Sequence, residues 1–185
     1  SSNQATFSWL RDYRLYQIII FSLGILLYAN TLFHDFTLDD AIVITDNEFT
    51  TQGIAGIDEL LQYDTFRGFF KEEGKESLVA GGRYRPLTPI FFAIIYQIFG
   101  ANSFVFHLFN ILLFAGTSIV LYRVLLYLLA PEGKREKAND YTYFIALITS
   151  LIFVVHPVHT EVVANIKGAD EIATLLGSLL ALYFC

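Results

Sequence analysis

The sequence has little charge, one cysteine and no methionine. Only 16% of its 185 residues are charged, whereas a soluble domain usually carries about 25% charged residues. Hydrophobic residues make up 55% of the chain. This balance excludes an ordinary water-soluble domain and indicates that much of the surface faces lipid. A nucleic-acid partner is also excluded, because no basic patch is large enough to neutralise a run of phosphates.

Both ends of the sequence look like cuts within a longer chain. Methionine is absent although phenylalanine occurs 18 times and tyrosine 11 times, so we expect that Ser1 is not the first residue of the gene product. The last residues lie in an apolar run without a helix-ending signal, so we expect the chain to continue beyond Cys185. One cysteine cannot form an internal disulfide. No small-residue cleavage site follows the first apolar run, which indicates an uncleaved anchor.

Four apolar stretches approach the length of about 20 residues that spans a membrane. A fifth stretch, 87–99, is shorter and follows Pro86, so it predicts an interfacial or re-entrant helix. The sequence therefore predicts an all-α polytopic membrane protein. The four expected spans are 15–33, 104–130, 141–156 and 172–185, the last of them ended by the chain terminus.

The orientation of the connections depends on the short stretch 87–99. If it does not cross the membrane, the basic segments 1–14 and 131–140 share the cytoplasmic side, as the positive-inside rule expects. Segments 34–86 and 157–171 then share the outer side. If 87–99 does cross, 157–171 moves to the cytoplasm. We prefer the first topology, because 34–86 holds eleven acidic and five basic residues, an excess that equals the formal charge of −6 of the whole chain.

The outer connection 34–86 is too long to be a typical passive link, and ordered loops of this length are often functional. Within it, 57–63 and 65–71 predict short amphipathic helices that rest on the membrane surface. The sequence KEEGKES and the glycine pair that follows it predict flexible turns. We therefore expect juxtamembrane helices in this connection.

Charged pairs mark both ends of the same connection. Asp39 and Asp40 near its start are suited to act as a general base, or to bind a cation or a sugar hydroxyl; the alternative is a solvated loop start or a helix N-cap. Arg83 and Arg85 lie at its end. Guanidinium groups match phosphate oxygens bidentately, while the alternative is anchoring of the chain in lipid headgroups.

A third polar cluster follows the expected span 141–156. Ionisable residues at membrane depth are costly and usually face an aqueous cavity or one another, so their accumulation predicts a functional site on the same side as Asp39. Two histidines and a glutamate in this cluster are suitable metal ligands, but their spacing matches no closed zinc site, and we expect that no metal is required. The cluster comprises His156, His159, Glu161, Lys167, Asp170 and Glu171.

The order of these pieces carries a resemblance that runs from Phe33 to Glu171. The matching segments are DFTLDD, GGRYRPLT, FHLFNILLF and LIFVVHPVHTEVVANIKGADE. In them the chain resembles the GT-C membrane glycosyltransferases, in particular the TMTC-like and PMT-like protein O-mannosyltransferases. It is similar to an N-terminal fragment of such an enzyme, and its wealth of Ile, Phe and Tyr looks like a Bacteroidetes-type bacterial member.

The resemblance implies transfer of a mannose-like sugar from a polyprenyl-phosphate donor to Ser or Thr hydroxyls of exported proteins, with inversion. It implies that Asp39 or Asp40 is the catalytic base, because a hydroxyl must lose its proton as it attacks. Arg83, Arg85 or Lys167 would stabilise the departing phosphate, and the rest of the third cluster would bind phosphate or sugar. The enzyme would lie in the bacterial inner membrane with its active site facing the periplasm, or in the endoplasmic reticulum membrane of a eukaryote.

One position departs from the family pattern. Relatives often carry an arginine immediately before the acidic pair at 170–171, where this chain has Ala169, so one phosphate or sugar contact is absent. Two alternatives therefore stay open: an inactive membrane subunit or scaffold that docks a partner through its outer loop, and a GT-C enzyme that glycosylates a lipid or a glycan. Full family members have further spans and usually tetratricopeptide repeats, so we expect the fragment alone to be inactive.

Overall fold

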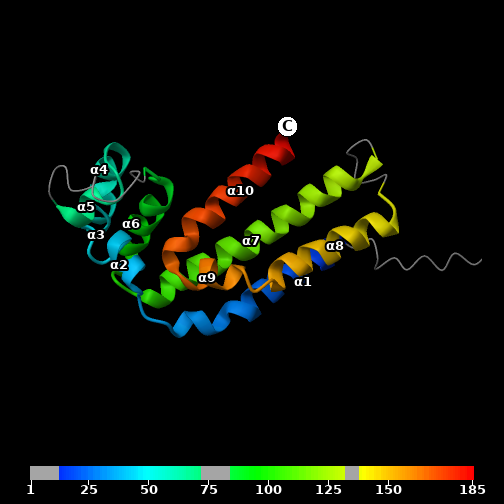
Figure 1. Ribbon diagram of the computed structural model, residues 1–185, viewed down its shortest axis with the longest axis horizontal. Coiled ribbons are helices and arrows are strands. Elements are labelled where there is room, and N and C mark those ends of the chain that lie inside the picture. The colour runs from blue at the N-terminus through cyan, green and yellow to red at the C-terminus, as the bar shows by residue number, and fades with distance from the viewer. Residues whose placement is uncertain (1–12, 72–83, 132–137) are drawn as a thin grey trace, which may run out of the picture.

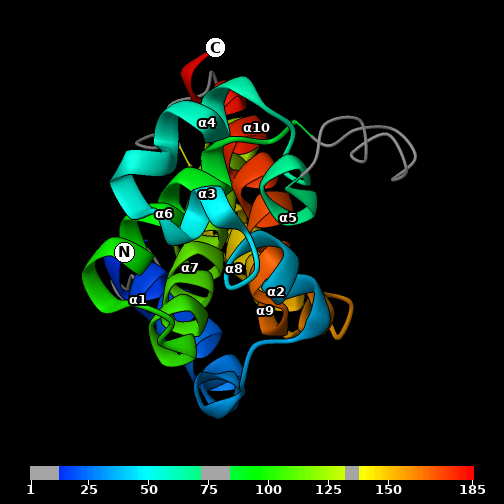
Figure 2. The ribbon, with the colours of Figure 1, turned by 90° about the vertical axis from the view of Figure 1, so that its left-hand side faces the viewer.

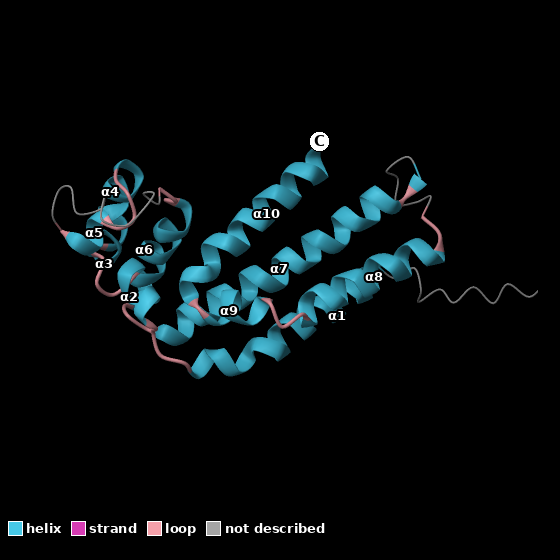
Figure 3. Cartoon of the chain, viewed as in Figure 1, coloured by secondary structure: helices cyan, strands magenta, loops and turns pink. Residues whose placement is uncertain are grey.

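The computed structural model describes residues 13–71, 84–131 and 138–185. Every regular element in these ranges is a helix (Figure 3). The α-helices are α1 (Tyr13–Tyr28), α2 (Leu38–Val43), α3 (Glu48–Thr51), α4 (Ile57–Gln62), α5 (Arg67–Phe70), α6 (Leu87–Phe99), α7 (Ser103–Leu129), α8 (Asp140–Val155), α9 (His159–Ala164) and α10 (Ala169–Phe184); the 3-10 helices are η2 (Ala29–Phe33), η3 (Gly53–Gly56) and η7 (Ile166–Gly168).

Four long helices form an elongated bundle, in which α7 contacts α1, α8 and α10 (Figure 1). Helices α1 and α8 run toward the same end of the bundle, and α7 and α10 run away from it (Figure 1). The short helices α2–α6 gather at that end, which we name the capped end (Figure 2). Segments that follow α1 and α8 in sequence therefore meet in space although more than a hundred residues separate them.

The apolar composition of the long stretches explains this bundle. The main core cluster includes Ile20 of α1, Ile111 and Tyr122 of α7 and Ala146 of α8, all fully buried. Helices α1 and α7 approach closely because small residues face each other: a Cβ added at Gly24 would lie only 3.3 Å from the Cβ of Ala115. Small residues at such contacts are typical of helix pairs in membranes.

Side-chain hydrogen bonds hold the short helices of the outer connection together. Asn47 is fully buried, and its amide nitrogen donates to the carbonyls of Ile42 and Thr65 at 3.2 and 2.9 Å. Its oxygen accepts from the backbone N–H groups of Phe49 and Thr50, both at 3.2 Å. One amide thus joins α2, α3 and the chain before α5, which compensates for helices too short to be stable alone.

A second hydrophobic cluster attaches this outer unit to the bundle. It combines side chains from α2, α6, α7 and the segment η7–α10. Each of them is nearly or fully inaccessible to solvent, so the outer unit is packed firmly on the bundle. The members are Val43, Ile44, Phe92, Phe106, Ile166 and Ala169.

Within the described residues, two helical stretches are long and apolar enough to cross a membrane, 13–33 and 103–129. Such stretches fit a membrane protein. Helices α8 and α10 have 16 residues each and α6 has 13. Segment 157–171, which we expected to be a loop, contains α9, η7 and the first turn of α10. The side assigned to each end stays a prediction. Of the basic residues that support it, Arg14 lies at the start of α1, and those within 1–12 and 132–137 lie outside the described residues.

Candidate functional site

Asp40 is a buried structural carboxylate at the start of α2. Its Oδ2 accepts from the backbone N–H and the hydroxyl of Thr37, at 3.0 and 2.9 Å. This arrangement closes the beginning of the helix, as a capping box does. Its Oδ1 accepts from the backbone N–H of Lys167 at 2.9 Å. Because both carboxylate oxygens accept hydrogen bonds from the protein and the residue is fully buried, a substrate cannot contact Asp40 in this arrangement.

Asp39 is placed differently, because successive residues on an α-helix point about 100° apart. Its side chain is 53% exposed, and its Oδ2 lies 3.2 Å from the Nζ of Lys167. Lys167 therefore contacts both carboxylates, Asp40 through its backbone N–H and Asp39 through its ammonium group. Of the two predicted catalytic aspartates, Asp39 is the one that a substrate can reach.

The corner between α9 and η7 positions Lys167. The side-chain oxygen of Asn165 caps η7 and accepts from the backbone N–H of Lys167 at 3.1 Å. From α7, the amide nitrogen of Asn110 donates to the carbonyls of Val162, Val163 and Asn165, at 3.2, 2.9 and 3.0 Å. Sequence reasoning missed Asn110, although a polar residue inside the apolar run FHLFNILLF is a recognisable signal.

Gly168 allows this corner to be tight. A Cβ added there would lie 2.2 Å from the carbonyl oxygen of Val162, which is far inside van der Waals contact. Only glycine fits without moving the backbone of α9 or η7. No sequence feature marked this glycine as special, because the close approach arises from tertiary packing.

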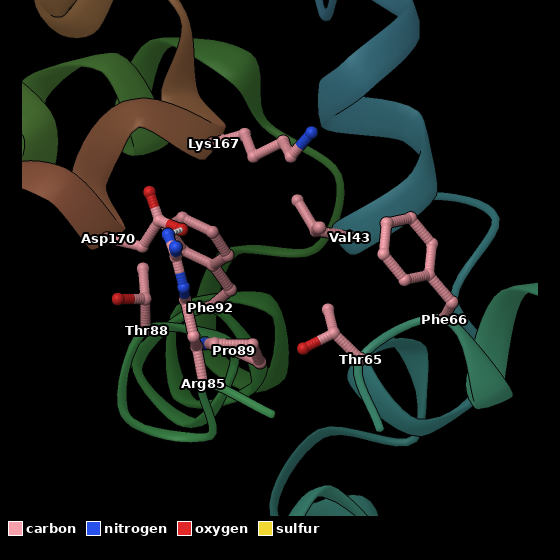
Figure 4. A pocket seen from close by; sticks show the side chains of 9 residues that line it. All are labelled: Val43, Thr65, Phe66, Arg85, Thr88, Pro89, Phe92, Lys167 and Asp170. Carbon is pink, nitrogen blue, oxygen red and sulfur yellow. Dashed lines mark hydrogen bonds and ion pairs between the residues drawn. The ribbon is translucent and has the colours of Figure 1, made fainter. Parts of the chain in front are cut away.

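Arg85 and Asp170 form an ion pair beside this corner. The Nη1 of Arg85 lies 2.5 Å from Oδ2 of Asp170, and the two side chains are 50% and 17% exposed. In Figure 4 the two side chains meet at one side of a pocket, and the side chain of Lys167 extends toward the helix that carries Val43. The neighbouring Ala169 is fully buried in the second hydrophobic cluster.

This pocket continues into a groove along the bundle. The pocket shares Arg85, Thr88 and Asp170 with an adjoining cavity. That cavity shares Leu87, Thr88 and Ala173 with a third cavity between α6, α7 and α10. We name the three together the α6–α10 groove. The walls of its far end are apolar and include Phe91, Phe109, Leu113, Leu176 and Leu180.

The histidines of the third cluster lie outside the α6–α10 groove. The ring of His159 packs on Phe153, with ring centroids 4.3 Å apart, and with Glu171 it lines a separate cavity. Burial, and then the charge of His156, lowers the pKa of His159. The ring of His156 accepts from the N–H of Val158 at 3.2 Å, so it stabilises the turn between α8 and α9.

The predicted site residues thus fall into two groups. Asp39, Asp40, Arg85, Lys167 and Asp170 come together. The others lie apart: His156 precedes α9, His159 begins it, Glu161 is exposed on it, and Glu171 lies in the first turn of α10. Arg83 lies outside the described residues. In the part of the chain that the structure describes, no group of three or more His, Cys, Asp or Glu side chains is arranged to hold a metal ion.

Similar sequences extend along most of this chain. A protein O-mannosyl-transferase of Caenorhabditis elegans is 34% identical over 166 residues, or 89% of the chain. Protein O-mannosyl-transferase TMTC4 of Homo sapiens is 31% identical over 176 residues, or 91%, and TMTC2 of Mus musculus is 31% identical over 169 residues, or 90%. The chain is a relative of the TMTC proteins.

The similarity to the TMTC proteins covers only part of them. The chain spans 22% of the length of the nematode and human relatives and 18% of mouse TMTC2, about a fifth of each. No protein-family profile matches the chain. No solved structure matches it either.

Proposed function

We propose that the whole protein transfers a mannose-like sugar from a polyprenyl-phosphate donor to Ser or Thr hydroxyls of proteins, with inversion at the anomeric carbon. The chain would form part of a GT-C fold. The names of its relatives support protein O-mannosylation. One observation of the structure carries the proposal: Lys167, which contacts the exposed carboxylate of Asp39, lines one end of a groove whose other end is apolar.

The two ends of the α6–α10 groove fit the two parts of such a donor. Arg85 and Lys167 line the polar end, and their guanidinium and ammonium groups match the oxygens of a phosphate. The apolar end between α6, α7 and α10 would take the first isoprenoid units, beside Phe91 and Phe109. Placing the phosphate at the cations would bring the sugar toward Asp39.

Asp39 supplies the base that this reaction needs. The acceptor hydroxyl gives its proton to the carboxylate as its oxygen attacks the anomeric carbon. The bond between that carbon and the phosphate oxygen breaks, and its electron pair leaves with the phosphate. Lys167 and Arg85 stabilise the charge that develops there. Attack on the face opposite the leaving group inverts the anomeric centre.

Both cations are paired with carboxylates in the present structure. Lys167 contacts Asp39 and Arg85 contacts Asp170, so the donor phosphate must compete for them. Exposed ion pairs contribute only about 0 to 1 kcal/mol, so the free energy needed to break them in favour of the phosphate is small. When Lys167 turns to the phosphate, the carboxylate of Asp39 becomes free to accept the proton.

We place the capped end on the outer side of the membrane, in the periplasm of a bacterium or the lumen of the endoplasmic reticulum. The acidic excess of the connection 34–86 supports this orientation. Protein acceptors would meet Asp39 there as they are exported.

The proposal is tested with the full-length protein in detergent, a polyprenyl-phosphate donor carrying radiolabelled mannose, and a Ser/Thr-rich peptide. We expect Asp39→Asn to lower the transfer rate by about 10²- to 10⁴-fold, the usual contribution of a general base. Asp46→Asn is the matched control, because Asp46 is an exposed carboxylate of the same outer unit, and it should keep the wild-type rate. Equal transfer rates for the two variants would exclude Asp39 as the base. Transfer of the sugar to a lipid or a glycan, with none to the peptide, would exclude a protein acceptor.

A further inference from the structure

Asn110 joins two parts of the molecule that are distant in sequence. It lies in α7 and is fully buried. Its Nδ2 contacts three carbonyl oxygens that belong to residues 52 to 55 positions later in the chain. An amide nitrogen has only two hydrogens, so one hydrogen is shared between two of these acceptors. The amide cannot be flipped, because its own oxygen would then face three carbonyl oxygens.

The bonds of Asn110 replace bonds that α9 cannot make itself. The last carbonyls of a helix have no partner within the helix, and those of Val162 and Val163 lie in the last turn of α9. The third acceptor is the carbonyl of Asn165, whose side chain caps η7. One buried amide therefore fixes the end of α9 and the start of η7 against α7.

We infer that Asn110 is a positioning residue that aligns Lys167 with Asp39, an inference that rests on the proposed role of Asp39 as the base. The path is continuous. Asn110 holds the carbonyl of Asn165, Asn165 holds the N–H of Lys167, and the same N–H binds Asp40. With its backbone fixed at this point, Lys167 places its Nζ 3.2 Å from Oδ2 of Asp39.

A purely structural role for Asn110 would weaken folding without changing this alignment. The two roles are separated by a cross-linking experiment that reports how positions 39 and 167 are aligned. In a cysteine-free background of the full-length protein, which includes Cys185→Ser, the substitutions Asp39→Cys and Lys167→Cys introduce two thiols at contacting positions. The rate at which a short bifunctional thiol reagent joins them reports the alignment and requires no enzymatic activity.

We expect Asn110→Leu, which has a similar volume and no donor, to slow this cross-linking about fivefold or more, the equilibrium effect of one net hydrogen bond. Asn110→Ser retains one hydroxyl donor and should give an intermediate rate, which keeps the test valid if the leucine variant does not fold. Ser118→Ala is the matched control. Ser118 is buried in the same helix, but its hydroxyl donates to the carbonyl of Phe114 within α7. It should leave the cross-linking rate unchanged.

An unchanged cross-linking rate in folded Asn110→Leu would overturn the inference. So would an equal decrease in Ser118→Ala, because the effect would then follow stability alone. Sugar transfer is assayed in parallel without the introduced thiols, where kcat should fall for Asn110→Leu and remain at the wild-type level for Ser118→Ala. If no variant transfers sugar but cross-linking still slows in Asn110→Leu, the proposed function fails while the positioning role stands.

Discussion

Replacing Asp40 by asparagine should destabilise the fold strongly. The carboxylate is fully buried and accepts from Thr37 twice and from Lys167 once. Asparagine keeps one oxygen and turns an NH₂ group toward a donor on the other side. A net hydrogen bond to a charged group contributes about 1.5 to 3 kcal/mol, and a buried donor without a partner costs about 1 to 3 kcal/mol. Because these effects overlap, we expect a loss of about 2 to 4 kcal/mol, a large fraction of the roughly 5 to 15 kcal/mol that stabilises a domain.

The assay is denaturant unfolding of the purified full-length protein in detergent, with Asp39→Asn as the comparison. Asp39 makes an exposed ion pair, so its substitution should change stability by less than about 1 kcal/mol while abolishing most of the transfer activity. Asp40→Asn should show the reverse, with reduced stability and substantial activity in the molecules that remain folded. If Asp40→Asn has wild-type stability and loses activity, the assignment of roles to the two aspartates is wrong.

Three further predictions concern Arg85, Gly168 and His159. Arg85→Lys removes the planar guanidinium but keeps the positive charge. It should weaken binding of a fluorescent polyprenyl phosphate by about tenfold or more, because hydrogen bonds to charged groups contribute about 1.5 to 3 kcal/mol. Unchanged affinity would exclude Arg85 as a phosphate ligand. Gly168→Ala should lower the free energy of unfolding by about 1 to 3 kcal/mol, because the new Cβ overlaps the carbonyl of Val162. Gly116→Ala is the control: a Cβ there meets nothing within 4 Å, so the free energy of unfolding should not fall. Burial lowers the pKa of His159 below 6.5, so the unfolded state binds a proton more readily than the folded state. The free energy of unfolding should therefore fall as pH drops below about 6.5 and level off below the pKa of the folded state. His159→Gln should reduce this dependence of stability on pH.

The long helices were predictable because their composition alone determines them. Segment 104–130 was expected to be a span and forms α7 at Ser103–Leu129, since an apolar run of this length has no other way to satisfy its backbone in lipid. The expected helix 57–63 appears as α4 at Ile57–Gln62. Helices α3 and α9 were not predicted, because four to six residues show no clear periodicity and such helices exist only through tertiary contacts such as those of Asn47.

The candidate site was predictable by residue type but not by role. Adjacent carboxylates look alike in sequence, and burial separates Asp39 from Asp40 only once the chain is folded. A local signal did exist, because Thr37 stands three residues before Asp40, which is the spacing of a capping box. The partner of that carboxylate could not be foreseen, since the backbone N–H of Lys167 carries no sequence signature.

The hydrogen bond between Asp40 and Lys167 joins positions 127 residues apart, so it can form only late in the synthesis of this part of the chain. Ribosomes extend chains at about 5 to 20 residues per second, so Asp40 is synthesised roughly 6 to 25 s before the amide that completes its shell. During that interval water must serve as the partner of its Oδ1, and α2 cannot dock in its final place. A chain that stops before η7 therefore keeps a solvated carboxylate oxygen at the capped end, and the Lys167 amide is the last donor to this carboxylate to be synthesised.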